Sequence, residues 1–435
     1  MAFGGGTWTA QDKRLPGTYI NFVSASGNAE ATGERGVVAC PIMMDWGPTG
    51  EVFDVTAGNL AKQSHKLFGY TADAEEMTDV YEVFCYATHV YFYRLNGGGT
   101  KAANTYAEAK YNGTYGNKIT IKIAASTEVE GGYIVSTIVD GEVEDAQTVT
   151  ASTGLKANDW VTWKTFELAA TAGTPLTGGA NAATVTAENH TAAMRAFEPY
   201  QFDVMIAPAD DAATINVYIA YAKRMNYEMG IKFQLVTFKT ESTADCELVS
   251  QVENTVEDDQ RQHALVYWIG GAIAGCALNT SLTGTVYNGR HKINTNYSQT
   301  ELADLADAGR FVMHRTGDVV RVLRDINSLV TFTDEKSETF SRNQTMRVVN
   351  YLATADAALF NENYSGVYIN NDAARSKLRN DLTEIRAGLV VEGAIGPYAG
   401  NMVISAGEDG RSVVMTDEIE IAETMEKLYI TQTIA

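Results

Sequence analysis

The sequence has few basic residues for its size. Its 33 lysines and arginines are outnumbered by 54 aspartates and glutamates, which gives a formal net charge of −21. Nucleic-acid binding depends on contacts between cationic side chains and phosphates, so this balance argues against DNA or RNA as a direct partner. Acidity on this scale is more typical of a soluble protein whose copies repel one another.

Cysteine is also scarce, and the chain has no long apolar run. Only four cysteines are present, Cys40, Cys85, Cys246 and Cys276, and no two of them form a CxxC pair. This spacing excludes the common zinc motifs and a disulfide framework, so we expect buried, reduced thiols. The most apolar stretch, which begins at Ala264, is shorter than the ~20 residues of a membrane span. We expect a buried helix there and no membrane binding by this chain.

Familiar catalytic and cofactor motifs are missing as well. The sequence contains no HExxH, GxSxG, GxGxxG or P-loop pattern, and no two histidines have a metal-ligand spacing. His89 lies in an aromatic stretch and is interpreted as a core histidine. The glycine-rich segments 176–179 and 270–275 lack the strand–loop–helix context of a phosphate site. We therefore predict no catalytic, cofactor-binding or metal-binding residues, and we expect the acidic run 252–260 to be a solvated face.

The hydrophobic pattern differs between two regions of the first half of the chain. An aromatic and β-branched stretch from Val80 to Leu95, which predicts a strand around His89, ends in three glycines. From about 100 to 180 apolar and polar residues alternate, and Asp140-Gly141 is a hairpin turn signal. This pattern predicts a small all-β domain inserted into a larger one.

From about residue 185, strand and helix patterns alternate. A short apolar strand, a helix that Asp210 or Asp211 can cap and Gly230 can end, and a strand over 231–238 predict a βαβ unit with parallel pairing. The last hundred residues hold two helices, from about Ser341 to Phe360 and from about Asn371 onward, followed by short strands.

Two strand-like segments lie near the ends of the sequence. Residues 17–24 follow a glycine-rich start, and residues 428–434 follow a segment, 418–423, that also predicts a strand. Terminal strands usually pair within their own chain, but two strand-like ends also suit β-augmentation, in which a strand completes a sheet of another subunit. The predicted exchange residues are Tyr19, Ile20, Asn21, Phe22, Val23, Leu428, Tyr429, Ile430, Thr431, Gln432 and Thr433.

Several stretches together resemble the sheath protein of contractile phage tails. They include KRLPGTYINFVS (13–24), AKYNGTYGNKITIKI (109–123) and VVMTDEIEIAETMEKLYITQTI (413–434). The similarity runs in order over nearly the whole chain, and it is to the sheaths of Gram-positive myophages and of phage-tail-like bacteriocins.

The resemblance implies an α+β multidomain fold with a β-sandwich insertion, an α/β central domain of the subtilisin-like type, and an α+β C-terminal domain with strand-donating terminal arms. The subtilisin-like label carries no protease activity. The expected division is an N-terminal arm (1–24), an N-terminal part of the core domain (25–99), the β-sandwich insertion (100–180), the subtilisin-like sheath domain (181–335), the C-terminal domain (336–421) and a C-terminal arm (422–435).

The resemblance also implies a structural role and no enzyme activity. In this family, hexameric rings stack helically around a tail tube and contract to drive the tube through the target cell envelope. The implied partners are other copies of the chain, the tail tube protein, and the baseplate and tail terminator proteins, without nucleic acid or cofactor. We expect the helix over 371–392 to face the tube through Arg375, Lys377, Arg379 and Arg386.

The same resemblance places the protein in a virion tail or a tail-like particle. The first residues lack the basic segment and apolar core of a secretory signal, so we expect assembly in the bacterial host cytoplasm. Two other interpretations stay open: an α/β hydrolase-like enzyme that uses the central domain, and a surface adhesin built on the β insertion. An enzyme should stay a small oligomer, whereas a sheath should form long tubes.

Overall fold

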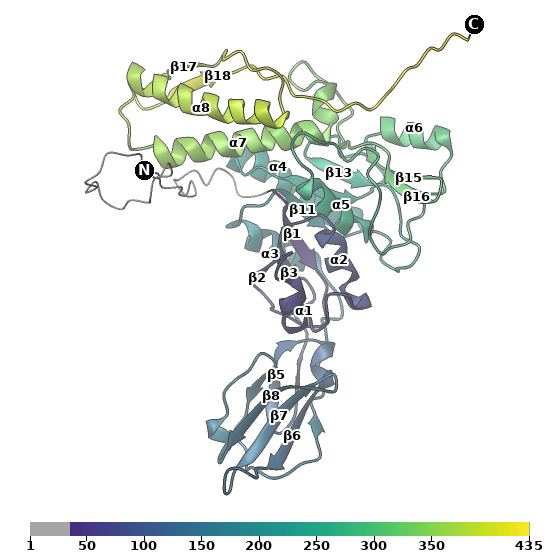
Figure 1. The fold of residues 1–435 in the computed structure, drawn as a ribbon, viewed down its shortest axis with the longest axis vertical. Coiled ribbons are helices and arrows are strands. Elements are labelled where there is room, and N and C mark those ends of the chain that lie inside the picture. The colour runs from purple at the N-terminus through teal and green to yellow at the C-terminus, as the bar shows by residue number, and fades with distance from the viewer. Residues whose placement is uncertain (1–34, 435) are drawn as a thin grey trace, which may run out of the picture.

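The computed structural model describes residues 35–434, which form an elongated molecule (Figure 1). A central α/β part lies between a β-rich part at one end and a pair of long helices that lies across the other end. The first predicted exchange segment, Tyr19–Val23, falls outside the described residues. Within residues 35–434, no helix combines the length and the apolar character that a membrane crossing requires.

The central part is built on a seven-stranded sheet in the order β14-β13-β12-β11-β1-β3-β2. All neighbours in this sheet pair in parallel except β2 and β3, which are antiparallel. The strands are β1 (Val37–Ile42), β2 (Val52–Thr56), β3 (His89–Arg94), β11 (Val204–Ala207), β12 (Gln234–Phe238), β13 (Val249–Val252) and β14 (Arg310–Phe311).

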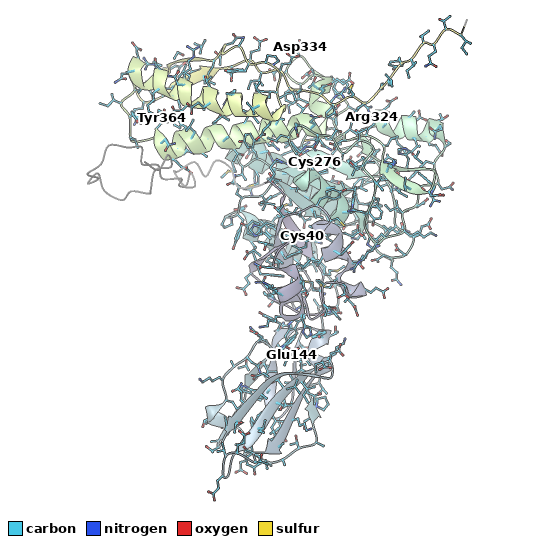
Figure 2. All side chains as sticks on the ribbon, viewed as in Figure 1. Cys40, Glu144, Cys276, Arg324, Asp334 and Tyr364 are labelled. Atoms are coloured by element: carbon cyan, nitrogen blue, oxygen red, sulfur yellow. The ribbon has the colours of Figure 1, made fainter. Side chains whose placement is uncertain are left out.

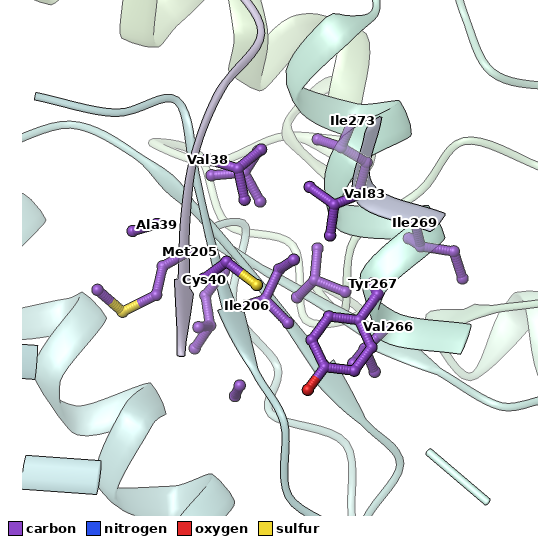
Figure 3. Packing of buried hydrophobic residues seen from close by; sticks show 14 of the residues in the cluster. Val38, Ala39, Cys40, Val83, Met205, Ile206, Val266, Tyr267, Ile269 and Ile273 are labelled. Carbon is purple, nitrogen blue, oxygen red and sulfur yellow. The ribbon is translucent and has the colours of Figure 1, made fainter. Parts of the chain in front are cut away.

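Helices cover this sheet, so the inner strands are apolar on both faces, as parallel strands usually are. Figure 3 shows that Val38 and Cys40 point toward α5, whereas Ala39 points to the opposite side of β1. All four cysteines are free thiols, and Cys40, Cys246 and Cys276 are buried as predicted, whereas Cys85 is only partly buried. The helices of this part are α1 (Leu60–Phe68), α2 (Thr78–Phe84), α3 (Ala187–Phe197), α4 (Ala212–Lys223), α5 (Leu265–Gly275) and α6 (Gln299–Asp307).

The predicted βαβ unit is confirmed. Strands β11 and β12 pair in parallel with α4 between them. The Asp211 carboxylate accepts a hydrogen bond from the Thr214 amide at 2.8 Å and so caps the first turn. A π-helical turn, Arg224–Met229, extends α4 until Gly230 ends it at a φ of 77°.

The stretch 80–95 is not a single strand, which corrects part of the prediction. Residues 78–84 form α2, because Val80 and Val83 lie three positions apart and both turn into the core. Gly271 on α5 lets the two helices approach closely, since a Cβ atom there would lie 2.2 Å from the Val83 carbonyl oxygen. His89 begins β3 and is only half-buried, with Nε2 3.3 Å from Asp54 Oδ2.

The β-rich part contains two antiparallel sheets that enclose their own apolar cluster. The predicted hairpin is confirmed at β7–β8, where Asp140 and Gly141 both have positive φ. The chain enters and leaves this part side by side, because Thr100 and Ala180 form an antiparallel bridge. Its strands are β4 (Lys101–Ala103), β5 (Ala107–Asn112), β6 (Ile119–Ala125), β7 (Tyr133–Val139), β8 (Glu142–Val149), β9 (Val161–Trp163) and β10 (Thr174–Pro175).

Two long helices, α7 (Asn343–Asn363) and α8 (Asp372–Glu392), dominate the remaining part. They lie side by side at the top of Figure 1. The Asn371 side chain caps α8, which begins where the sequence predicts a helix, and the leucine stripe of α8 (Leu378, Leu382 and Leu389) is buried. The short strands β17 (Val403–Ala406) and β18 (Val413–Thr416) form a two-stranded sheet beside these helices. A second small hairpin, β15 (Met313–Thr316) with β16 (Val319–Val322), precedes α7.

Candidate assembly interface

Residues 422–434 leave the body of the molecule as an extended segment (Figure 1). The root of this segment is held firmly. The Ala422 amide donates to the Ala394 carbonyl at 3.1 Å, and Gln344 Nε2 donates to the Ala422 carbonyl at 2.8 Å. Glu426 lies 3.5 Å from Arg324, which Figure 2 shows near the point where the segment leaves the body. The segment is therefore anchored as far as Glu426.

Beyond Glu426 the segment no longer contacts the described body of the molecule through hydrogen bonds. Residues 427–434 make no hydrogen bond to the rest of the described chain. Leu428, Tyr429, Ile430 and Ile434 are between 67% and 96% exposed. The predicted strand is therefore not formed within the single described chain, and its backbone donors and acceptors are open. Apolar side chains and backbone groups left open in this way form a surface suited to a partner.

A small sheet with open edges lies in the same part of the molecule. Strands β17 and β18 pair only with each other among the described residues. Val403, Val414 and Met415 on these strands are exposed. A two-stranded hairpin is marginally stable alone and gains stability from further strands. This sheet therefore has two edges to which a strand can be added.

A groove of about 900 Å³ runs beside α7, next to a third open edge. The segment 418–423 was predicted to be a strand, but only Ile421 forms a bridge, with Ile395. On the other side of this segment, no backbone of the described chain pairs with it. The apolar side chains that line the groove are Phe340, Val349, Leu352, Ile419 and Ile421. The groove and edge together could hold an extended, apolar segment.

Three of the four predicted tube-facing residues lie at the surface of α8. Lys377 is half-exposed, and its Nζ lies 2.8 Å from the Asp381 carboxylate, a hydrogen bond that raises the pKa of Lys377. Arg375 pairs with Asp372, and Arg379 donates to the Gly400 carbonyl at 2.9 Å. Each of these cations has a local partner on the protein surface.

The expectation that Arg386 is exposed is wrong. Its side chain is only 2% exposed and donates to Asp356 at 2.6 Å and to Asp417 at 3.0 Å. Burial alone would lower the pKa of Arg386, but the two carboxylates outweigh it and raise the pKa. The sequence carried the signal, because Arg386 follows Leu382 by four residues and so lies on the buried stripe.

At the sheet edge where α/β enzymes bind their substrates, the described residues form no serine-, threonine- or cysteine-based site. A cavity of about 390 Å³ lies at the carboxyl ends of β1 and β3, the usual position for such a site. Within the described chain its lining contains no serine, threonine, cysteine, lysine or histidine. The polar groups that line it are Asp45, Tyr70, Glu76, Asp79, Asn96 and Arg261. This lining does not provide the nucleophile and base of an acyl-transfer site.

A charged cluster adjoins this cavity and is organised around an arginine. Ligand-type atoms of Asp79, Asp259 and His291 lie within 4.8 Å of one another. Arg261 pairs with both carboxylates; burial acts to lower the pKa of Arg261, but the nearby carboxylates and Tyr267 together outweigh it and raise the pKa. The cation of this cluster is thus supplied by the protein. The acidic run 252–260 is only partly solvated, because Asp259 belongs to it.

Comparison with known protein families adds an independent line of evidence. Residues 183–328 match the phage tail sheath protein central domain, and residues 335–435 match the phage tail sheath C-terminal domain. Residues 35–95 match the N-terminal region of domain III of the tail sheath protein Gp18. These three matches follow one another along the chain and leave out the β-rich part.

Comparison with individual proteins agrees with the family matches. The fold is similar to the crystal structure of a sheath tail protein from Desulfitobacterium hafniense, with 30% identity, a TM-score of 0.81 and coverage of 95% of this chain and 99% of that one. The phage-like element PBSX protein XkdK of Bacillus subtilis (strain 168) is 29% identical over 379 residues, 80% of each chain.

A more distant likeness extends to an assembled particle. The helical sheath of the anti-feeding prophage in its contracted state has a TM-score of 0.54 at 9% identity, over 97% of this chain and 99% of that one, which shows a shared fold. Together, the three family matches and the near-complete likeness to a sheath tail protein establish that the chain belongs to the phage tail sheath protein family.

Proposed function

We propose that this chain is the structural subunit of a contractile tail sheath, which polymerises as helically stacked hexameric rings around a tail tube. The observation that carries the proposal is the segment 427–434, which follows the anchor at Glu426, pairs with no other part of the described chain and exposes its apolar side chains. Open strand edges at β17–β18 and at 419–423 are suitable acceptors for such a segment from another copy.

Strand donation of this kind can hold a lattice together while its subunits rotate. Each added backbone hydrogen bond contributes about 1 kcal/mol net. Burying Leu428 or Ile430 adds roughly 1.5–3 kcal/mol each. The root at Glu426 fixes where the segment leaves its parent subunit. A few such residues are therefore enough to hold two copies together strongly while the subunits rotate relative to each other.

Contraction of such a lattice requires no nucleotide. Packed interfaces between rigid parts can have two discrete arrangements, and an assembly held in one can be released to the other. We propose that contraction drives the tube through the target cell envelope. The fold shared with the contracted sheath of the anti-feeding prophage supports this proposal. The proposed partners are the tail tube protein, the baseplate and the tail terminator, in a particle assembled in the host cytoplasm.

The proposed contact with the tube uses three cations of α8, of which Lys377 and Arg379 are exposed and Arg375 is partly buried. Arg375, Lys377 and Arg379 each have a surface partner that could be exchanged for an acidic group on the tube. Arg386 is left out of this surface because it is buried. Such rim charges would contribute more to association rate and register than to affinity.

We also propose the division into arms and domains that the sequence analysis gives, including a β-sandwich insertion and a central domain of the subtilisin-like type. Separate apolar clusters in the central and β-rich parts support it. The parallel sheet covered by helices supports the α/β character of the central domain.

Removing residues 427–435, which leaves the anchor at Glu426 in place, tests the proposal. We expect the shortened chain to fold, because residues 427–434 make no hydrogen bond to the rest of the described chain. We also expect it to lose polymerisation, whereas the full chain forms long tubes in negative-stain micrographs. A shortened chain that is unfolded by circular dichroism would contradict the assignment of this segment to another copy.

A matched pair of full-length variants sharpens the test. Leu428→Asp with Ile430→Asp places charges on the apolar face of the segment, and Thr431→Asp with Thr433→Asp places them on the other face. We expect the first variant to stay unassembled and the second to form tubes. A small, uniform oligomer from the unmodified chain would instead favour the hydrolase-like alternative.

A further inference from the structure

A cavity lined by charged groups of the central part lies at the amino ends of its parallel strands. It has a volume of about 520 Å³ and is bounded on one side by α7. First residues of β1, β3 and β12 line it, namely Val37, His89 and Gln234. It therefore lies at the opposite sheet edge from the cavity near Asp79, and the proposed assembly does not use it.

Positive charge is concentrated around this cavity. Arg35, Lys232 and Arg347 line it, in a chain whose net charge is −21. Arg35 pairs with Asp203 at 3.2 Å, and Arg347 pairs with Asp325 at 2.8 Å. These pairs neutralise two of the three cations.

Lys232 has no carboxylate within ion-pair distance in the described chain. Its Nζ donates to the Asn226 carbonyl at 2.6 Å, and burial lowers the pKa of Lys232. Asp203 cannot serve it readily, because its other carboxylate oxygen already accepts from the Gly36 and Val37 amides. Within residues 35–434, Lys232 therefore has no ion-pair partner, and the more distant Glu247 only partly offsets the effect of burial on its pKa.

Arg347 gives a second, independent sign that an acceptor is missing. Its side chain is fully buried, and only Nη2 is bonded, to the Thr280 carbonyl and to Asp325. Nε and Nη1 have no hydrogen-bond partner. Buried donors without partners are costly, and proteins rarely keep them. The missing partner of these donors is an oxygen acceptor.

The rest of the lining suits an organic molecule better than a bare ion. The volume falls within the range of small-molecule sites. Phe202, Tyr91 and Tyr351 supply apolar and aromatic surface, while Gln201 and Asn350 supply amide groups. We propose that this cavity binds a small organic oxyanion, a carboxylate or phosphate group joined to an apolar body.

The source of the oxyanion is a free small molecule and not a side chain of another subunit. Arg347 is fully buried, so an acceptor for its Nε and Nη1 has to enter between α7 and the sheet, which a small molecule does more readily than a group fixed to another backbone. Bound there, the molecule contacts strands β1 and β12 together with α7. It therefore joins the central sheet to the C-terminal helices.

Calorimetric titration of the full chain with benzoate and with phenyl phosphate tests the proposal, with benzyl alcohol as the uncharged probe. We expect saturable binding of at least one anion and none of the alcohol. Lys232→Met should weaken anion binding by about tenfold or more. The matched control Lys292→Met, at a lysine whose side chain is 73% exposed, should leave it unchanged.

A second variant covers the case in which Lys232→Met fails to fold. Thr354 lies on α7 and lines the cavity, so Thr354→Trp fills it without changing any charge. We expect this variant to fold and to lose anion binding. The proposal is wrong if neither anion binds the unmodified chain, if Lys292→Met weakens binding as much as Lys232→Met, or if Thr354→Trp binds normally.

Discussion

Buried arginines join elements that lie far apart in the sequence. Arg94, at the end of β3, donates to the Asn112 carbonyl at 2.6 Å and to the Asn181 side chain at 3.0 Å. It thus ties both connections of the β-rich part to the central sheet, and burial lowers the pKa of Arg94 to about 10. Arg386 does the same between α7 and the segment after β18.

Arg386→Met tests the weight of one such contact. The change leaves Asp356 and Asp417 without their shared cation. Removing one partner of a buried ion pair typically lowers the free energy of unfolding by about 3–5 kcal/mol. Arg379→Met, at an exposed position on the same helix, should cost less than about 0.5 kcal/mol. Urea unfolding followed by circular dichroism compares the two, and equal losses would contradict the buried role of Arg386.

Glu82 gives a prediction about pH. Its carboxylate is fully buried and accepts hydrogen bonds from the Tyr287 hydroxyl at 2.8 Å and the Arg290 amide at 2.5 Å. Burial raises the pKa of Glu82 above its ordinary value of 4.5. A raised pKa stabilises the folded state fully below the unfolded value, and this contribution is lost as the pH rises through the folded value.

Glu82→Gln should therefore gain melting temperature relative to the unmodified chain as the pH rises from 4.5. The unmodified chain must hold a buried charge at high pH, whereas the glutamine stays neutral. Thermal unfolding of both proteins across pH 4.5–8 measures the difference. A difference that shrinks as the pH rises would contradict the raised pKa.

At the scale of elements, the contact between α2 and α5 depends on glycine. In Gly271→Ala, the new Cβ would lie 2.2 Å from the Val83 carbonyl oxygen. The helices must then separate, at a cost of about 1–3 kcal/mol. The same change at Gly388 on α8 meets no atom within 4 Å and should stabilise by about 0.5–1 kcal/mol. Thermal unfolding of both variants checks this, and a loss at both sites would refute the packing argument.

Local sequence signals predicted most of the regular elements. Capping by Asp211 and the turn at Asp140-Gly141 are local events, and both occur where the sequence predicts them. The helix over residues 78–84 was harder to predict from the sequence, because β-branched and aromatic residues favour a strand. Packing against α5 outweighs that preference, and it involves residues almost two hundred positions away.

The prediction for 418–423 failed for a related physical reason. Alternation favours a strand there, but a strand needs a neighbour along its whole length. The described chain supplies that neighbour only at Ile395. Arg386 shows the opposite case, because its place on the leucine stripe was visible in the sequence. A charged residue on an apolar stripe indicates a buried ion pair that an exposed-face interpretation misses.

At the scale of the whole molecule, the unsatisfied features gather at one end. The open edges of β17–β18, the groove beside α7 and the extended segment all belong to the C-terminal part (Figure 1). The β-rich part at the other end has its own closed core. The sequence alone could suggest that the ends are donated, but the acceptor edges became visible only in the folded chain.

The central claim is that residues 427–434 complete a sheet of another copy. A cryo-electron microscopy map of the assembled tube tests it most directly. The account predicts continuous density from Glu426 of one subunit into a strand paired with β17, β18 or the 419–423 edge of an adjacent subunit. Density that turns back and pairs inside the parent subunit, with no contact to any neighbour, would contradict it.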